Sequence, residues 1–230
     1  MLLSHTAGFP NWRRFTDAGK LAINFEPGSR YAYSGEGIDL LQLVVETVAR
    51  KPLEEVMQKR VFTPLQMTRT SMVWQERFED DYANGYDEVG RSLGPQRRKS
   101  ADAAGSMQTT LRDFSRFMGA VMRGEGLRQK TRELMLSPQI SDHLQTSISD
   151  ARKRTDGRKQ SYSPQLRTCL GALLDTFDEP KTGMVIMTNS ANGEGIFKEL
   201  LETLLADTFT PIEWEGYTPY DQLPPKKRIE

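Results

Sequence analysis

Apolar side chains recur at helical spacing through residues 36–136. Within residues 36–50 they follow the i, i+3, i+4, i+7 spacing of an amphipathic helix. These apolar positions are Ile38, Leu41, Val44, Val45 and Val48. A second, short helix is predicted after Lys51, because Pro52 can occupy the first position of a helix. That helix would present Leu53, Val56 and Met57.

The sequence around Thr110 carries the start signal of a further helix. Thr110 followed by Asp113 resembles a capping box, with Asp in place of Glu. The apolar face of this helix would consist of Leu111, Phe114, Phe117, Met118 and Val121. Gly124 and Gly126 are expected to end it, and another helix is predicted from Leu127 to Leu136.

The last part of the chain has a strand pattern. Residues 166–177 and 183–189 are predicted to form two strands joined by a hairpin loop that contains Pro and Gly. The run from Met184 to Met187 is continuously apolar, as in a strand buried on both faces. A strongly apolar final helix follows over residues 196–205. The tail over residues 211–230 is rich in Pro and Tyr and is expected either to wrap the surface or to be disordered.

The remaining segments are polar. Residues 4–35 and 72–102 are interpreted as loops and turns, with a short extended piece near Tyr86. Residues 137–165 are expected to be the least structured part of the chain. The basic run over residues 150–159 is interpreted as a solvated loop, because no aromatic residues interleave its charges.

Composition narrows the function classes. The 230 residues carry 31 basic and 31 acidic side chains, so a nucleic-acid binder that relies on a general cationic field is not expected. The single cysteine, Cys169, excludes an internal disulfide and is expected to be a small buried apolar residue. No apolar run approaches the ~20 residues that span a membrane. The first residues lack the basic leader and apolar core of a signal peptide.

Five phrases carry a family resemblance. Residues 2–8 (LLSHTAG) are similar to an LLxHTSG phrase, and residues 27–35 (PGSRYAYSG) to PGxxxxYSN. Residues 64–67 (PLQM) are similar to PLGM, residues 104–107 (AGSM) to AGGL, and residues 185–190 to a late strand. In this order they resemble the β-lactamase-related serine hydrolases, which include class C β-lactamases, DD-peptidases and family VIII esterases.

The resemblance implies an α+β fold. We expect a partial β-lactamase/transpeptidase-like fold, with a helical subdomain and a remnant antiparallel sheet packed on the C-terminal helix. The incomplete domain would span residues 1–210, with a mostly helical part at 36–136 and a strand–strand–helix part at 166–207. Residues 211–230 would be the tail. Strand edges left unpaired in such a fold predict self-association.

Family chemistry places a general base in the second phrase. The resemblance implies that Tyr33 is this base, with Ser34 and Gly35 completing the catalytic phrase. Gly35 stands where many relatives have Asn, so a hydrogen-bond partner for the substrate is lost. The competing interpretation is that Tyr33 is an ordinary half-buried tyrosine with a satisfied hydroxyl.

The nucleophile of the family lies in a Ser-x-x-Lys motif. No lysine in these 230 residues has Ser or Thr three positions before it. Lys181-Thr182-Gly183 spells the third family motif, but the pattern places it in the turn between the last two strands, so we interpret it as a decoy. Of the two histidines, His5 is a structural loop residue in relatives, and His143 has no acid or serine at a recognised motif spacing. No metal site and no cofactor are expected.

Three functions remain open. The first is a serine hydrolase that cleaves a small ester, β-lactam or D-amino-acid peptide with Tyr33 as base. The second is a non-catalytic remnant that binds a ligand or partner. The third is a fragment of a longer active hydrolase whose Ser-x-x-Lys motif lies upstream of Leu2. By itself, the present chain is expected to be inactive. Full-length relatives are usually exported, but the compartment of this chain stays open.

Overall fold

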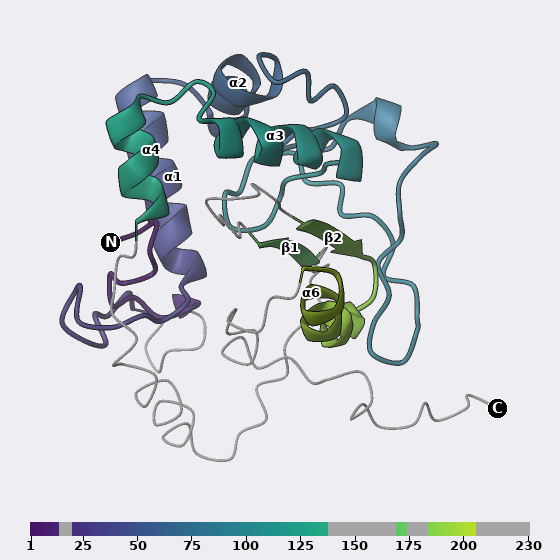
Figure 1. Cartoon of the computed structure of the whole chain (residues 1–230), viewed down its shortest axis with the longest axis horizontal. Helices are drawn as coiled ribbons and strands as arrows, with labels where there is room; N and C mark the ends of the chain where they lie inside the picture. Colours follow the sequence, from purple (N-terminus) through teal and green to yellow (C-terminus); the bar gives the residue numbers. More distant parts are fainter. Residues whose placement is uncertain (14–19, 138–168, 174–183, 206–230) are drawn as a thin grey trace. The chain divides into compact units, whose positions relative to one another are not determined.

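The computed structural model describes residues 1–13, 20–137, 169–173 and 184–205 (Figure 1). The chain divides into two compact units. The first holds Met1–Trp74 and the described residues 98–137, and the second holds Gln75–Arg97 with the described residues 169–173 and 184–205. The described residues combine helices with antiparallel strands, so the α+β class is confirmed.

Helix α1 spans Gly35–Ala49 and confirms the first predicted helix. Its N-cap Ser34 accepts a hydrogen bond from the backbone N–H of Gly37, and the left-handed Arg50, with φ 52°, ends it. The predicted apolar face is only partly covered. Val44 is 47% exposed and Val48 is 81% exposed, so these two residues do not face the core.

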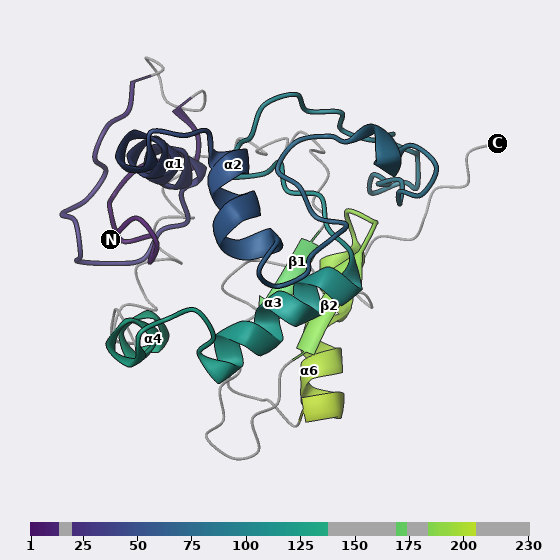
Figure 2. The ribbon, with the colours of Figure 1, turned by 90° about the horizontal axis from the view of Figure 1, so that it is seen from above.

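Helix α2 (Leu53–Met57) continues into the π-helical turn η2 (Gln58–Phe62), as Figure 2 shows. Pro52 is the N-cap of α2 rather than its first helical residue, with φ −56° and ψ 148°. The core of the first unit forms around this turn from Leu53, Phe62, Met67 and Met72. Val45 of α1 and Phe117 of the next long helix pack against that cluster.

Helix α3 (Leu111–Arg123) begins and ends where the sequence predicts. The Thr110 hydroxyl accepts the Asp113 N–H at 3.3 Å, and Gly124 ends the helix with φ 74°. The Asp113 carboxylate binds elsewhere, because it accepts the Arg69 N–H at 2.6 Å and the Thr70 hydroxyl at 3.0 Å. The reciprocal half of a capping box is therefore replaced by a tertiary contact. Helix α4 follows over Gln129–Leu136.

The second unit contains the predicted hairpin strands. Strand β1 (Cys169–Leu173) pairs antiparallel with β2 (Met184–Thr188), with Cys169 opposite Thr188 (Figure 1). All five β2 residues are half-buried, so the prediction of burial on both faces is wrong. A two-stranded described sheet gives each strand a single hydrogen-bonded neighbour. The turn η5 (Gly193–Ile196) leads into α6 (Phe197–Leu205), which buries Phe197 and Leu201.

The short extended piece predicted near Tyr86 also belongs to this unit. The Tyr86 N–H donates to the Asn189 carbonyl at 2.8 Å, and the Tyr86 carbonyl accepts the Ala191 N–H at 2.9 Å. These bonds attach the 75–97 segment to the end of β2. No helix among the described ranges is long and apolar enough to cross a membrane.

Several predictions lie outside the described residues. They concern the basic run at 150–159, His143, the Lys181-Thr182-Gly183 turn and the 211–230 tail. Cys169 is placed on β1, but the surroundings of its side chain are not among the described features.

Candidate functional site

The first two family-like phrases lie against each other. The Thr6 carbonyl accepts the Gly28 N–H at 2.7 Å, and the His5 carbonyl accepts the Ala32 N–H at 2.9 Å. Gly8 lies at the same contact with φ +83°, and a Cβ there would come within 2.5 Å of the Phe25 carbonyl oxygen. Only glycine fits this close backbone approach. The loop over residues 1–8 thus forms a support for residues 31–35.

His5 is the central contact of that support. Its Nδ1 atom accepts the backbone N–H of Ser34 at 3.2 Å. The imidazole ring lies 4.6 Å from the Tyr33 ring at 35°, and 5.8 Å from the Tyr31 ring in an edge-on arrangement. Burial lowers the pKa of His5 below its ordinary value of 6.5, because the charged form loses solvation.

Tyr33 has one face against His5 and remains 46% exposed. The N-cap Ser34 separates it from α1, so the helix N-terminus fixes the backbone on one side and His5 contacts the ring on the other. The exposed ring can meet a molecule from solvent, as the predicted general base must.

The Ser34 hydroxyl forms two local hydrogen bonds. Its hydroxyl donates to the Pro10 carbonyl at 2.8 Å and accepts the Gly37 N–H at 2.9 Å, and the residue is buried. With both hydrogen-bonding directions satisfied, Ser34 holds the end of α1 in place. Its predicted membership of the catalytic phrase remains a prediction.

Gly35 lies beside two residues that the sequence did not single out. Its N–H donates to Asn11 Oδ1 at 3.1 Å. A Cβ at this position would come within 2.5 Å of Trp12 Cη2, so the indole fills the space that a side chain would need. Sequence reasoning missed Asn11 and Trp12 because they occupy an aperiodic loop between the two phrases.

An ion pair joins the same loop to the first turn of α1. The Glu36 carboxylate accepts the Arg13 backbone N–H and its Nε–H, each at 2.8 Å. The Arg13 hydrogen bond holds the pKa of the buried Glu36 carboxyl below its usual value, against the effect of burial. A negative charge in the first turn also suits the helix dipole.

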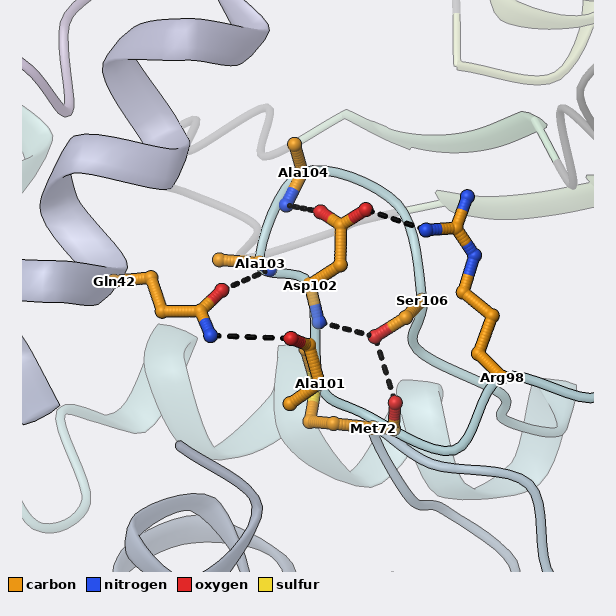
Figure 3. Close-up of polar contacts among 8 residues, drawn as sticks. All are labelled: Gln42, Met72, Arg98, Ala101, Asp102, Ala103, Ala104 and Ser106. Atoms are coloured by element: carbon orange, nitrogen blue, oxygen red, sulfur yellow. Dashed lines mark hydrogen bonds and ion pairs between the residues drawn. The ribbon is translucent and has the colours of Figure 1, made fainter. Parts of the chain in front are cut away.

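A second polar cluster lies where α1 meets the AGSM phrase (Figure 3). The Gln42 amide donates to the Ala101 carbonyl at 3.1 Å and accepts the Ala103 N–H at 2.8 Å. The buried Ser106 hydroxyl accepts the Asp102 N–H at 2.8 Å and donates to the Met72 carbonyl at 2.6 Å. Residues 101–106, which overlap this phrase, therefore form a structural joint between α1 and Met72 in this unit.

A shallow pocket of about 290 Å³ opens beside this joint. It is lined by Asp39, Gln42, Leu43, Glu46, Ala101 and Asp102. Burial, followed by the neighbouring charges of Asp102 and Glu36, raises the pKa of Asp39 to about 6. Asp102 is held by Arg98 Nη1 at 2.6 Å. The Asp39 carboxyl can therefore carry a proton under mildly acidic conditions. No sequence signal pointed to the neighbouring carboxyls of Asp39 and Asp102, because these two residues are far apart in the chain.

The described residues contain no group of three or more His, Cys, Asp or Glu side chains arranged to hold a metal ion.

The Beta-lactamase family model matches residues 1–205. The β-lactamase/D-alanine carboxypeptidase of Pseudomonas syringae is 25% identical, over 56% of this chain and 38% of that one, with a TM-score of 0.46. The D-amino acid amidase of Ochrobactrum anthropi SV3, solved with L-phenylalanine, is 27% identical, over 57% of this chain and 44% of that one, with a TM-score of 0.47.

The octameric penicillin-binding protein homologue of Pyrococcus abyssi is 24% identical, over 61% of this chain and 38% of that one, with a TM-score of 0.49. This chain thus spans less than half the length of each of these three solved structures.

Proposed function

This chain belongs to the β-lactamase family, and on that premise we propose that its Tyr33 segment forms the general-base side of a serine-hydrolase site. The ancestry accounts for the partial α+β fold of the β-lactamase/transpeptidase type. We also propose that these 230 residues form no acyl-enzyme by themselves. The observation that carries this second statement is that no lysine follows a Ser or Thr by three positions.

The chemistry explains why both parts are needed. A serine hydroxyl must lose its proton as it attacks a carbonyl carbon, and a positioned base accelerates that step by about 10²–10⁴-fold. Tyr33 supports the base role because its ring is exposed on one face and held by His5 on the other. A free tyrosine has a pKa of about 10. Tyr33 therefore needs a cationic partner such as the lysine of Ser-x-x-Lys before it can accept a proton near neutral pH.

The substrate class follows from the family and from residue 35. The proposed substrates are small esters, β-lactams or D-amino-acid peptides, each attacked at its carbonyl carbon. Gly35 offers no side-chain amide to such a molecule, and the Trp12 indole lies in the space beside it. Substrate contacts at this point would then be made by an apolar ring rather than by an amide.

Activity-based labelling tests the proposal. The purified chain is incubated with a fluorophosphonate and, separately, with a fluorescent penicillin, and is then digested for mass spectrometry. We expect no modified serine and no turnover of nitrocefin or p-nitrophenyl butyrate. A label at one defined serine, lost in Tyr33→Phe, would show that a serine of this chain reacts with the probe without a Ser-x-x-Lys motif.

The base role has a separate test. If the DNA upstream of codon 1 encodes Ser-x-x-Lys in frame, the longer protein should be labelled. Tyr33→Phe should then slow its acylation by about 10²–10⁴-fold. Acylation that survives Tyr33→Phe unchanged would remove Tyr33 from the mechanism. Saturable binding of these substrates to the present chain without turnover would instead favour the non-catalytic binding function.

A further inference from the structure

We propose that His5 is a positioning residue for Tyr33, holding it through one imidazole nitrogen and one ring face, and that protonation of this nitrogen releases the hold. The functional meaning of this inference rests on the proposed role of Tyr33 in hydrolysis. The contacts themselves do not depend on that role.

His5 contacts four consecutive residues. Its ring meets the rings of Tyr31 and Tyr33, its carbonyl accepts the Ala32 N–H at 2.9 Å, and its Nδ1 accepts the Ser34 N–H at 3.2 Å. The segment immediately before α1 is therefore held at each residue by one histidine. A residue that merely filled space would not use its backbone, its ring and one ring nitrogen on the same segment.

The direction of the Ser34 bond fixes the tautomer. A backbone N–H can only donate, so Nδ1 must present its lone pair, and the proton of the neutral ring lies on Nε2. Protonation adds a proton to Nδ1, so that both ring nitrogens carry one. Nδ1 is then a donor that faces the Ser34 N–H, which is also a donor. The imidazolium cannot keep this contact.

The backbone of His5 adopts an uncommon conformation. His5 has φ 52°, in the left-handed region that non-glycine residues rarely occupy. Such a conformation costs free energy and persists where the surrounding contacts determine it. The contacts that hold it here are the local turn, in which the His5 N–H donates to the Leu2 carbonyl at 3.2 Å, and those to residues 31–34.

The groups around the imidazole include two phenols and one ion pair. The titratable groups that face the imidazole are the phenols of Tyr31 and Tyr33. The charges on the neighbouring elements, Glu36 on α1 and Arg13 on the preceding loop, bind each other at 2.7 Å. Because burial lowers the pKa of His5, the hold is complete at neutral pH and is lost only below the ordinary histidine value of about 6.5.

Nuclear magnetic resonance tests the coupling without any turnover. The chain is labelled with ¹⁵N and with ¹³C at tyrosine Cζ, and Tyr33→Phe assigns the Tyr33 signal. His143→Gln leaves His5 as the single histidine. Asp39→Asn removes a carboxyl whose pKa is about 6 and which would otherwise titrate in the same range. We expect the Ser34 amide, the Tyr33 Cζ and the His5 ring signals to titrate with one shared midpoint. Flat Ser34 and Tyr33 signals while His5 titrates would overturn the proposal.

Two substitutions separate the nitrogen from the ring. His5→Asn places an amide oxygen near the Nδ1 position, and Asn tolerates the left-handed region. His5→Gly removes both the acceptor and the ring and suits the same backbone. The Ser34 amide shift should survive in His5→Asn without its titration and be lost in His5→Gly, while the Tyr33 signal should move in both. Unchanged Tyr33 and Ser34 signals in His5→Gly would contradict the proposal.

The outcomes are distinguishable from those of the proposed function. A Tyr33 that takes no part in acylation would leave these resonances and their shared midpoint unaltered. Conversely, if Tyr33 takes part in acylation but its Cζ signal does not respond to titration or substitution of His5, the hydrolase proposal stands and the positioning role of His5 is wrong.

Discussion

The indole of Trp12 lies directly against Gly35, where an added Cβ would be 2.5 Å from Cη2. This contact couples the loop before the Tyr33 segment to the first residue of α1. It also leaves no room for a side chain at residue 35 unless the ring moves.

Adding a side chain at residue 35 should destabilise the chain. Gly35→Asn forces the Trp12 ring to move, and overpacking of this kind costs about 1–3 kcal/mol of unfolding free energy. Urea denaturation followed by fluorescence measures the change. Gly105→Ala is the matched control, because a Cβ there meets no atom within 4 Å. An equal effect of the two substitutions would show that the ring contact does not restrict residue 35.

The Asp39 carboxyl should make stability depend on pH. Its pKa is raised from 3.8 to about 6 in the folded chain, so the folded state binds more protons than the unfolded state between these values. The contribution of Asp39 to the unfolding free energy is therefore complete below about pH 3.8 and is lost as the pH rises through about 6.

Asp39→Asn should remove that part of the pH dependence. Unfolding is measured in urea at several values between pH 4 and 7, with Asp80→Asn as an exposed control. A slope that is identical in the wild-type chain and in Asp39→Asn would contradict the assignment.

The buried Asp113 carboxylate should be needed for stability. Asp113→Ala removes the 2.6 Å acceptor of the part-buried Arg69 N–H and the 3.0 Å acceptor of the buried Thr70 hydroxyl, and a buried polar group that loses its partner costs about 1–3 kcal/mol. Glu125→Gln removes a carboxylate from an exposed ion pair with Arg123 and should cost less than about 1 kcal/mol. Equal losses in the two variants would indicate that the Arg69 contact contributes little.

The uncovered face of α1 should favour association between copies. Val44 and Val48 are one helical turn apart and are exposed. Val48→Lys should shift sedimentation toward the monomer while changing the unfolding free energy by no more than about 0.5 kcal/mol. Thr47→Lys adds the same charge at an exposed polar position and serves as the control. A wild-type chain that stays monomeric at high concentration would show that the exposed valines do not associate.

Local sequence signals predicted the elements well. The period of apolar residues located α1, and Thr110 with Gly124 located both ends of α3, because helix caps depend on residues within a few positions of each other. The hairpin of β1 and β2 was also predicted, since Pro and Gly mark its connection.

Tertiary relationships were not predictable in the same way. The Asp113 carboxylate binds Arg69, 44 positions away, and no spacing rule connects them. Burial was predicted least well where it depends on neighbours. Val48 fits the apolar period of α1 and is nevertheless exposed, because periodicity identifies a face but not what covers it.

The joint drawn in Figure 3 has a consequence for sequence drift. The Gln42 side chain binds residues 101 and 103 through main-chain groups, the Ala101 carbonyl and the Ala103 N–H. The two alanines are thus interchangeable with other small residues as far as these bonds are concerned, and packing alone limits what they can become. Gln42 has no such freedom, because deamidation to glutamate would turn the donor that meets the Ala101 carbonyl into a repelling oxygen. Chemical ageing at this one amide would open the joint from the helix side while leaving the loop sequence intact.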